Sequence, residues 1–403
     1  MNEIIVQKFG GTSVGSVERI DAVAEIIKKA SQSNRIVVVV SAMEGETNKL
    51  VNLAKNFSDN PDKREFDALV ATGETVSSAL LAMALHSKGL KAKSYSASQI
   101  SMRTTDSFSK AKILDVDAKK ILEVLEEDTI PIITGFQGIT ETGDVTTLGR
   151  GGSDTTAVAI AAQVKAERCD IYTDVDGIYT TDPKIVPNAK KLDSITMEEM
   201  LELAGQGAKV MQTRAVEFAN KYEVPVRVLS SFNEGTGTLI SLKEDTMENA
   251  LVSGIASQKN QVKFTLHGVG DIPGTAFKIL GPISDAEVEV DVIVQNVSVD
   301  GKTDFTFTVS SEDQGTVNKV IQEMNDVEYK ELIVNSDIAK VSLVGVGMRS
   351  QAGVASRAFK ALSENDVNIQ IICTSEIKIT MVIDESLVDK AVKVLHEEFE
   401  LDK

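Results

Sequence analysis

The first 230 residues alternate short apolar segments with amphipathic helical segments, and this alternation limits the possible folds more than any other feature of the chain. Such a pattern is typical of an α/β domain in which helices cover both faces of a mostly parallel sheet. Ligands of these sheets bind beyond the carboxyl ends of the strands, so we expect the chemistry in the loops that follow them. The predicted strands are Ile4–Phe9, Ile36–Ser41, Lys91–Ser94, Ile130–Phe136, Cys169–Thr173 and, last, Val226–Leu229, and the predicted helices are Val17–Ser31, two within Glu65–His86, Val116–Glu127 and Asp154–Val164.

Beyond residue 250 the chain contains an internal repeat. Lys263–Gly270 aligns with Val341–Gly347, and matching glycines at positions 274 and 353 each precede a predicted helix. Chance similarity is the alternative, but glycine and helix positions match as well as hydrophobicity. Each copy is predicted to fold as a βαββαβ unit. The paired predictions are helices Thr275–Leu280 and Val354–Leu362, strands Val288–Ile293 and Val367–Ile372, and closing helices Gln314–Met324 and Leu387–Phe399.

The domain division follows from these patterns. Asn233–Thr238 is expected to form a boundary turn, and Glu244–Asn249 a charged connector. The predicted parts are residues 1–240 for the α/β domain, 241–250 for the connector, 251–337 for the first repeat unit and 338–403 for the second, while a strand at 251–257 fits either unit.

Composition excludes several classes of function. The chain has 60 acidic and 42 basic residues, a net charge of −18, which argues against a nucleic-acid partner. The N-terminus lacks the pattern of a signal peptide, and the apolar run Ile36–Val40 is far too short to cross a membrane. Cys169 and Cys373 lie far apart and show no metal spacing, so we predict no metal site made by the protein. We therefore expect a cytoplasmic protein that does not enter membranes.

Two glycine-rich loops precede predicted helices. In the first, Gly10 and Gly11 let the backbone approach an anion and Lys8 supplies a positive charge, although a purely structural turn explains a lone Gly-Gly pair equally well. The second, Thr147–Thr156, contains Arg150 among three glycines. Ser and Asp in this loop suit a helix N-cap, but a cap does not need the arginine, whose planar fork suits a carboxylate or phosphate.

Other candidate residues also lie near the expected ligand edge. The acids of Tyr172–Lys184 either form turns or hydrogen-bond a ribose or metal-bound water, and Tyr179 is a candidate to stack on adenine. Lys184 and Lys209 are candidates to neutralise phosphates. Glu74, near a helix start, is either a complement to the helix dipole or an acceptor for an ammonium group.

Three motifs together resemble the aspartate kinase family: KFGGTSV at Lys8–Val14, TLGRGGSDTTA at Thr147–Ala157 and YTDVDGIYTTDP at Tyr172–Pro183. The paired repeats resemble the ACT domains that follow the catalytic domain in that family. The resemblance implies an amino-acid-kinase fold and phosphorylation of the β-carboxylate of L-aspartate by MgATP to 4-phospho-L-aspartate. This is the first committed step towards lysine, threonine, methionine and diaminopimelate. Position 184 is Lys where the family often has Arg.

The chemistry of the residues agrees with this reaction. An acceptor carboxylate is already deprotonated at neutral pH, so the site needs positioning and charge neutralisation and no general base. The resemblance implies that Lys8 and Asp154 are catalytic, with Asp154 holding Lys8 in place. It assigns ATP to Lys8, Gly10, Gly11, Ser41, Thr173, Asp174, Tyr179, Lys184, Lys209 and Val210, aspartate to Thr47, Glu74, Arg150, Gly151, Gly152 and Ser153, and Mg²⁺ to phosphate oxygens and water.

The resemblance also implies feedback inhibition by lysine, threonine or both through the ACT pair, although turn-forming glycines are the alternative explanation of these loops. The expected effector residues are Asp271, Pro273, Gly274, Ala276, Gln295 and Asn296 in the first repeat, and Met348, Val354, Thr374, Ser375 and Glu376 in the second.

The expected assembly is a homodimer, or an α2β2 complex with a shorter subunit started at Met247. A kinase for glutamate, acetylglutamate or a nucleotide is a rival function. A non-catalytic amino-acid sensor built on a degenerate kinase is another. The intact set of Lys8, Glu74, Arg150 and Asp154 argues against the sensor.

Overall fold

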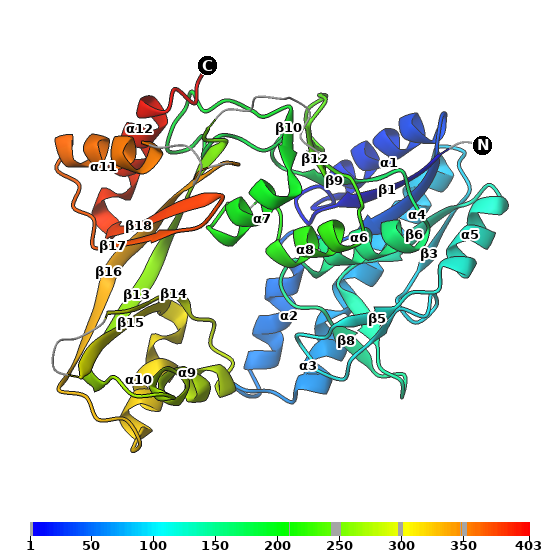
Figure 1. Cartoon of the computed structure of the whole chain (residues 1–403). Coiled ribbons are helices and arrows are strands. Elements are labelled where there is room, and N and C mark those ends of the chain that lie inside the picture. The colour runs from blue at the N-terminus through cyan, green and yellow to red at the C-terminus, as the bar shows by residue number, and fades with distance from the viewer. Residues whose placement is uncertain (1–2, 209, 243–250, 297–300, 347, 349–352) are drawn as a thin grey trace. The chain divides into compact units, whose positions relative to one another are not determined.

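The computed structural model describes residues 3–208, 210–242, 251–296, 301–346, 348 and 353–403. The chain forms two compact units (Figure 1). The first comprises Met1–Tyr179, Lys191–Gly205 and Lys209–Asn249, and the second comprises Thr180–Lys190, Gln206–Ala208 and Ala250–Lys403.

The first unit is built on a sheet whose described strands run in the order β10-β12-β11-β9-β1-β2-β6-β3. Its neighbouring strands are parallel except for the pair β11 and β12. The predicted α/β class with a mostly parallel sheet is therefore confirmed. The strands are β1 (Ile4–Phe9), β2 (Arg35–Val40), β3 (Ala92–Tyr95), β6 (Ile130–Thr134), β9 (Arg168–Thr173), β10 (Ser194–Thr196), β11 (Val226–Ser230) and β12 (Thr238–Ser241).

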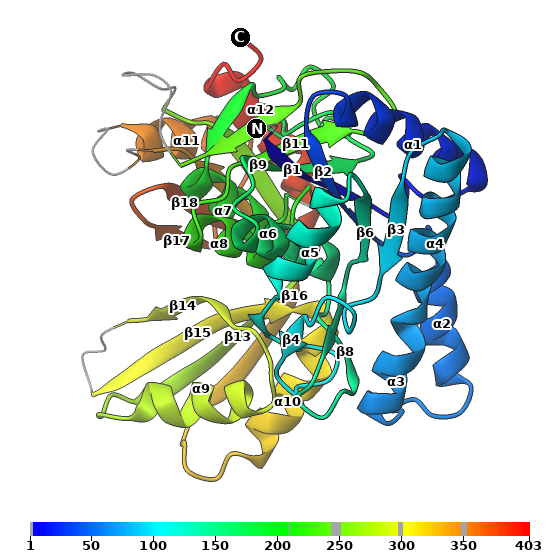
Figure 2. The same cartoon turned by 90° about the vertical axis from the view of Figure 1, so that its right-hand side faces the viewer.

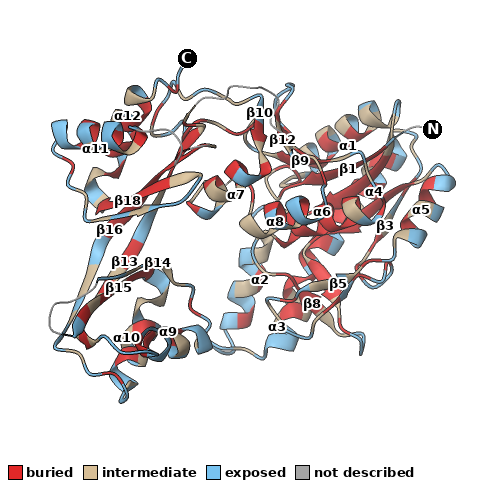
Figure 3. Cartoon of the chain, viewed as in Figure 1, coloured by how far each residue is buried: buried red, intermediate tan, exposed pale blue. Residues whose placement is uncertain are grey.

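Helices cover both faces of this sheet, with α1 and α4 on one side and α5, α6 and α8 on the other (Figure 2). Figure 3 shows buried residues along β1 and β6 and exposed residues on the outer side of α5. Strands buried on both faces need a continuous apolar sequence, which β2 has in Ile36–Val40. The helices of the unit are α1 (Val17–Ser31), α2 (Glu46–Lys55), α3 (Lys63–Val70), α4 (Thr72–Ser87), α5 (Ala118–Glu126), α6 (Gly152–Gln163), α7 (Met197–Gly205) and α8 (Thr213–Lys221).

The register brings the carboxyl ends of the central strands level with one another. Phe9 lies opposite Val40 on β2 and Tyr172 on β9, and Val40 lies opposite Thr134 on β6. The rings of Phe9 and Tyr172 stack with centroids 4.7 Å apart. The loops that follow β1, β2, β6 and β9 therefore start at one edge of the sheet.

A second, smaller sheet in this unit has the strand order β5-β4-β7-β8 and was not predicted. Its strands are too short to give an alternating pattern that sequence periodicity can detect. The strand β8 leads directly into the glycine-rich loop that contains Arg150. The strands are β4 (Arg103–Thr104), β5 (Ile113–Asp115), β7 (Gln137–Ile139) and β8 (Val145–Thr147).

One stretch of the first unit, Lys63–Ser87, has the length and hydropathy of a membrane span, and half of its apolar window is buried. It comprises α3 and α4. Within it, Leu81, Ala82 and Leu85 pack into a core shared with α1 and the main sheet.

The second unit contains both repeats in one sheet with the order β14-β15-β13-β16-β18-β17. The long strands β13 and β16 pair along both repeats, Gln261–His267 opposite the first half of β16 and Gly254–Gln258 opposite Val344–Lys340. Val252 and Ile255 belong to the hydrophobic core of the second repeat. The elements are β13 (Gly254–Gly270), α9 (Thr275–Asp285), β14 (Asp291–Gln295), β15 (Lys302–Ser310), α10 (Gln314–Glu323), β16 (Glu331–Val344), α11 (Val354–Glu364), β17 (Ile371–Thr374), β18 (Lys378–Asp384) and α12 (Val388–Glu398), with short 3-10 helices at Ser311–Asp313 and Glu385–Leu387.

The segment Thr180–Lys190 comes from the middle of the chain but packs in the second unit. Val186 is buried in the core of the second repeat. The Thr180 hydroxyl lies 3.0 Å from Nε2 of His396 and donates to the Leu401 carbonyl at 3.2 Å. The predicted division, which gives all of residues 1–240 to the first domain, therefore does not account for this segment.

Three predictions of local structure were wrong. Val226–Leu229 does not end the sheet of the first unit, because Asn233–Thr238 leads into the further strand β12. The strands predicted to start at Val288 and Val367 start three and four residues later, at Asp291 and Ile371. The reason is the same in both repeats.

Val288 and Val367 close the preceding helices. The Val288 N–H donates to the Ile283 carbonyl and the Val367 N–H to the Leu362 carbonyl. In each case the preceding residue has a positive φ, which is the geometry of a Schellman cap with a hydrophobic residue after the left-handed position. These valines are apolar because they cap a helix, and not because they start a strand.

Candidate active site

A pocket of about 300 Å³ opens at the carboxyl edge of the main sheet in the first unit. This is the position at which parallel sheets bind ligands. Its walls come from the loops after β1 and β2, the start of α4, and the glycine-rich loop before α6. The lining residues are Lys8, Gly11, Ser41, Ala42, Met43, Glu44, Gly45, Thr47, Glu74, Phe136, Gly149, Arg150, Gly151, Gly152, Ser153 and Asp154.

An ion pair between Lys8 and Asp154 lies in the wall of this pocket. Nζ of Lys8 is 2.6 Å from Oδ1 of Asp154, and each side chain is only 10% exposed. Lys8 is the penultimate residue of β1, and Asp154 lies in the first turn of α6. Because water is largely excluded, the charges interact more strongly than they would at the surface. The pair holds the lysine in place at the ligand edge.

Arg150 stands on a loop whose shape depends on glycine. Gly149 and Gly151 have φ angles of 77° and 69°, in the left-handed region that other residues rarely adopt. A Cβ on Gly151 would lie 1.9 Å from Cγ of Gln212, so no larger residue fits there. Arg150 itself is exposed and lines the pocket. The loop therefore presents an exposed guanidinium to the pocket.

Glu74 is a buried acid with one oxygen free. Its Oε1 accepts the Ala42 N–H at 3.1 Å, whereas Oε2 is buried without a hydrogen-bond partner among the described residues. Burial raises the pKa of Glu74 to about 7, against the opposing effect of the backbone hydrogen bonds. Gly73 permits this close packing, since a Cβ there would lie 2.7 Å from that of Ala42. Such an oxygen suits a cationic group of a ligand.

The pocket gathers all six residues predicted to bind aspartate and three of those predicted to bind ATP. The predicted residues that line it are Lys8, Gly11, Ser41, Thr47, Glu74, Arg150, Gly151, Gly152, Ser153 and Asp154. Six further lining residues were not predicted, namely Ala42, Met43, Glu44, Gly45, Phe136 and Gly149. The first four directly follow a buried strand and include a glycine, Gly45, and this position was the sequence signal that could have identified them. In the structure Gly45 has a φ of 79°.

The Gly10 N–H, predicted to bind phosphate, already has a partner in the sheet. That N–H donates to the Tyr172 carbonyl at 3.1 Å and so continues the ladder between β1 and β9. The two glycines therefore have different roles: Gly10 hydrogen-bonds within the sheet, whereas Gly11 lines the pocket. A Cβ on Gly11 would lie 3.1 Å from the Ala42 carbonyl oxygen.

The other residues predicted to bind ATP are not among those that line this pocket. Thr173 ends β9 and donates its hydroxyl to Asp174 at 3.0 Å. The hydroxyl of Tyr179 donates to Asp176 at 2.8 Å, and this hydrogen bond raises the pKa of Tyr179. Val210 is half-buried. Lys184 belongs to the second unit, and Lys209 lies outside the described residues.

The predicted effector loop of the first repeat is open to solvent. Gly274 precedes α9 with a φ of 94°, and no atom of a described residue lies within 4 Å of where its Cβ would be. Oδ1 of Asp271 accepts Nε2 of Gln295 at 3.5 Å. Pro273, Ala276 and Asn296 are exposed.

The second repeat differs from the first. Met348 and Val354 are 5% and 2% exposed and their side chains belong to its hydrophobic core, so any contact of these two residues with an effector would have to come from their backbone. Thr374, the last residue of β17, is exposed, as are Ser375 and Glu376 in the turn that follows. No group of three or more potential metal ligands occurs among the residues that the structure describes.

Comparison with known proteins agrees with these observations. Residues 3–230 match the amino acid kinase family, and residues 341–399 match the ACT domain. The aspartate kinase Ask_LysC of Stutzerimonas stutzeri is 56% identical over 402 residues, which cover 99% of this chain and 98% of the relative. An aspartokinase of Helicobacter pylori is 48% identical over 409 residues, covering 99% and 100%.

Solved structures agree with this relationship. Aspartokinase III of E. coli in complex with aspartate and ADP, in the R-state, has a TM-score of 0.84 at 28% identity, covering 98% of this chain and 99% of that one. The same enzyme with lysine and aspartate, in the T-state, has a TM-score of 0.77 at 29% identity with the same coverage. The predicted resemblance is confirmed: the chain belongs to the aspartate kinase family, whose members are phosphotransferases that act on a carboxyl group.

Proposed function

We propose that the pocket of the first unit binds L-aspartate beside the terminal phosphates of ATP, and that Lys8 stabilises the phosphoryl group during its transfer. The observation that carries this proposal is the set of charges in one pocket. It combines a lysine held by a buried acid, an exposed arginine on a rigid loop and a buried acid with a free oxygen. A phosphoryl transfer between two anions needs this kind of positive charge.

The proposed aspartate site matches the charges of the amino acid. Arg150 takes the α-carboxylate, because its fork can form two parallel hydrogen bonds. Oε2 of Glu74 takes the α-ammonium group, and Thr47 and Ser153 add hydrogen bonds. All four residues line the pocket. Aspartate held at its α-carbon would leave the β-carboxylate free to accept the phosphoryl group.

No general base is required in this proposal. The β-carboxylate is ionised at neutral pH, since a free Asp side chain has a pKa near 3.9. Asp154 therefore acts by keeping the Nζ of Lys8 in position, 2.6 Å away, and not by removing a proton. Positioning and charge neutralisation supply the catalysis.

We expect ATP to bind beside this pocket, in contact with Ser41, Thr173, Asp174, Tyr179 and Val210. A relative was solved with ADP, which supports a nucleotide site in this family. Mg²⁺, when bound, would neutralise charge on the phosphates, whose oxygens with water would be its ligands.

Regulation is assigned to the second unit. We infer that lysine, threonine or both bind beside the Asp271 loop of the first repeat, in the cytoplasm, as feedback signals of the pathways that aspartate feeds. The exposed carboxylate of Asp271 and the open backbone at Gly274 support this site. A relative was solved with lysine. The proposed assembly is a homodimer or an α2β2 complex that uses Met247 as a second start.

We expect Lys8→Ala to lower kcat about 10³-fold with little change in the KM for aspartate, because it removes a contact made mainly in the transition state. Steady-state ATP turnover with aspartate measures both constants. Lys49→Ala is the control, since Lys49 is an exposed lysine of α2 paired with Glu46. Near-normal turnover of Lys8→Ala would remove Lys8 from the reaction.

We expect Arg150→Ala to raise the KM for aspartate by about 10²-fold, since a bidentate, charge-assisted contact with the α-carboxylate is lost. The KM for ATP should change by less than about threefold. Arg103→Ala, which removes an exposed arginine paired with Asp115, is the matched control. An unchanged KM for aspartate would place the α-carboxylate elsewhere.

We expect kcat/KM for aspartate to rise with pH through about 7, the pKa of Glu74. Burial raises this pKa, so Glu74 is neutral below that pH and anionic above it, and only the anion attracts an ammonium group. The profile of kcat/KM reports groups of the free enzyme. Glu74→Gln should have a lower kcat/KM and lose this step; a step that persists in the variant would contradict the assignment.

We expect titration calorimetry of the full chain to detect binding of lysine, threonine or their mixture, and Asp271→Asn to weaken it about tenfold by loss of the charge that pairs with the effector ammonium. Asp285→Asn, an exposed acid at the end of α9, is the control. Equal affinity in wild type and Asp271→Asn would move the effector away from this loop.

A further inference from the structure

Asp67, on α3, is a buried carboxylate that the reaction does not use. It is fully buried. Its oxygens accept four hydrogen bonds, from the N–H and hydroxyl of Ser109 at 2.8 and 3.1 Å and from the N–H and hydroxyl of Thr147 at 2.7 and 2.9 Å. Burial of a charge is costly unless such donors replace water. Asp67 therefore binds two segments that are distant in sequence.

Both segments adjoin the Arg150 loop: one enters it and the other packs against it. Thr147 is the last residue of β8, three residues before Arg150. The Ser109 carbonyl lies beneath Gly149, because a Cβ on that glycine would be 3.1 Å from its oxygen. Asp67 thus holds the strand that enters the loop and the backbone against which the loop packs.

Arg214, on α8, also hydrogen-bonds the backbone that leads into the Arg150 loop. Its Nη1 donates to the Leu148 carbonyl at 2.7 Å and its Nη2 to the Ala111 carbonyl at 2.8 Å. The Ala111 N–H in turn donates to the Thr147 carbonyl at 3.0 Å. The two residues before Gly149 are therefore attached to α3, to α8 and to the segment 109–111.

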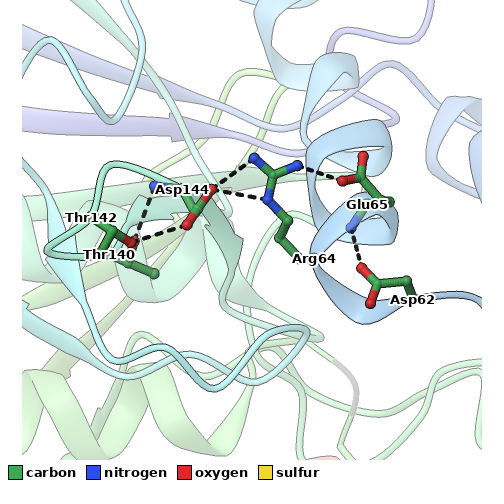
Figure 4. Close-up of polar contacts among 6 residues, drawn as sticks. All are labelled: Asp62, Arg64, Glu65, Thr140, Thr142 and Asp144. Carbon is green, nitrogen blue, oxygen red and sulfur yellow. Dashed lines mark hydrogen bonds and ion pairs between the residues drawn. The ribbon is translucent and has the colours of Figure 1, made fainter.

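The antiparallel strands β7 and β8 form a hairpin, and the ion pair at its turn contrasts with the contacts of Asp67. There Arg64, also on α3, pairs with Asp144 through Nε and Nη2 at 2.9 and 2.8 Å, beside Thr140 and Thr142 (Figure 4). Arg64 is 51% exposed. Ion pairs at the surface contribute little to stability. Of the two links between α3 and this hairpin, the buried one adjoins the active-site loop.

We propose that Asp67 and Arg214 are positioning residues that fix the Arg150 loop for binding of the substrate α-carboxylate, an inference that rests on the proposed aspartate site. Neither lines the pocket, so both act through the loop. A loop with glycines in the left-handed region has little stiffness of its own. Small displacements of a binding group are costly, about 10²-fold per ångström.

The test is the KM for aspartate in Asp67→Asn, which keeps the shape of the side chain but loses acceptor capacity. We expect this KM to rise about tenfold while kcat and the KM for ATP stay within about twofold. In the Arg150→Ala background the same substitution should raise the KM no further. A second variant, Arg214→Lys, can reach only one carbonyl and should show the same split if Asp67→Asn does not fold.

Two controls separate positioning from general loss of stability. Asp170 is an equally buried carboxylate of the first unit that accepts from Arg168 and Arg227. Asp170→Asn should lower Tm as Asp67→Asn does, yet leave the KM for aspartate within about twofold. Arg64→Gln removes the exposed ion pair between α3 and the hairpin. It should change neither Tm nor the KM for aspartate by a comparable amount.

The outcomes are distinguishable. A raised KM in Asp67→Asn that is absent from Asp170→Asn and from the Arg150→Ala background supports the proposal. An unchanged KM in Asp67→Asn and Arg214→Lys, while Arg150→Ala raises it, overturns the positioning role but leaves the aspartate site intact. Additive effects of Asp67→Asn and Arg150→Ala also overturn it. If Arg150→Ala leaves the KM unchanged, the proposed aspartate site itself fails, and with it this inference.

Discussion

The ion pair between Lys8 and Asp154 joins the two halves of the active site. Lys8 is near the end of β1, and Asp154 is at the start of α6, 146 positions later in the chain. At 10% exposure, neither charge could remain without the other, because an unpaired charge in that setting would be costly. The loops on either side, Gly10-Gly11 and Gly149–Gly152, therefore meet at one edge of the sheet. The pocket exists where they meet.

The charge of the whole chain is a poor guide to this site. A net charge of −18 gives a field that repels anions, yet aspartate kinases act on two anionic substrates. The pocket solves this locally, with Lys8 and Arg150 among its lining residues. Two of its acids do not leave a free negative charge at the pocket: Asp154 pairs with the lysine, and burial raises the pKa of Glu74 to about 7.

Much of the fold could be predicted from sequence because local patterns determine it. Strands such as Ile36–Val40 are apolar throughout, and glycine-rich loops identify the ligand edge. The two misplaced strand starts have one physical cause, which is that an apolar residue can serve two purposes. Val288 and Val367 are apolar, as strand residues are, but each of them closes the preceding helix. Contacts over long separations, such as Asp67 with Thr147, leave no local pattern, so the residues that support Arg150 could be found only in three dimensions.

The excursion of Thr180–Lys190 into the second unit has a consequence for any product of an internal start. A chain that began at Met247 would carry every strand of the six-stranded sheet described here, and both β13 and β16 would keep their partners. It would lack Val186, leaving a gap in the second repeat's core, and Thr180, leaving the Leu401 carbonyl without its hydroxyl donor. Such a subunit would also lack Gln206–Ala208, so the Ser342 hydroxyl would lose the Gln206 side-chain oxygen to which it donates. The first of the two missing segments directly follows the YTDVDGIY motif.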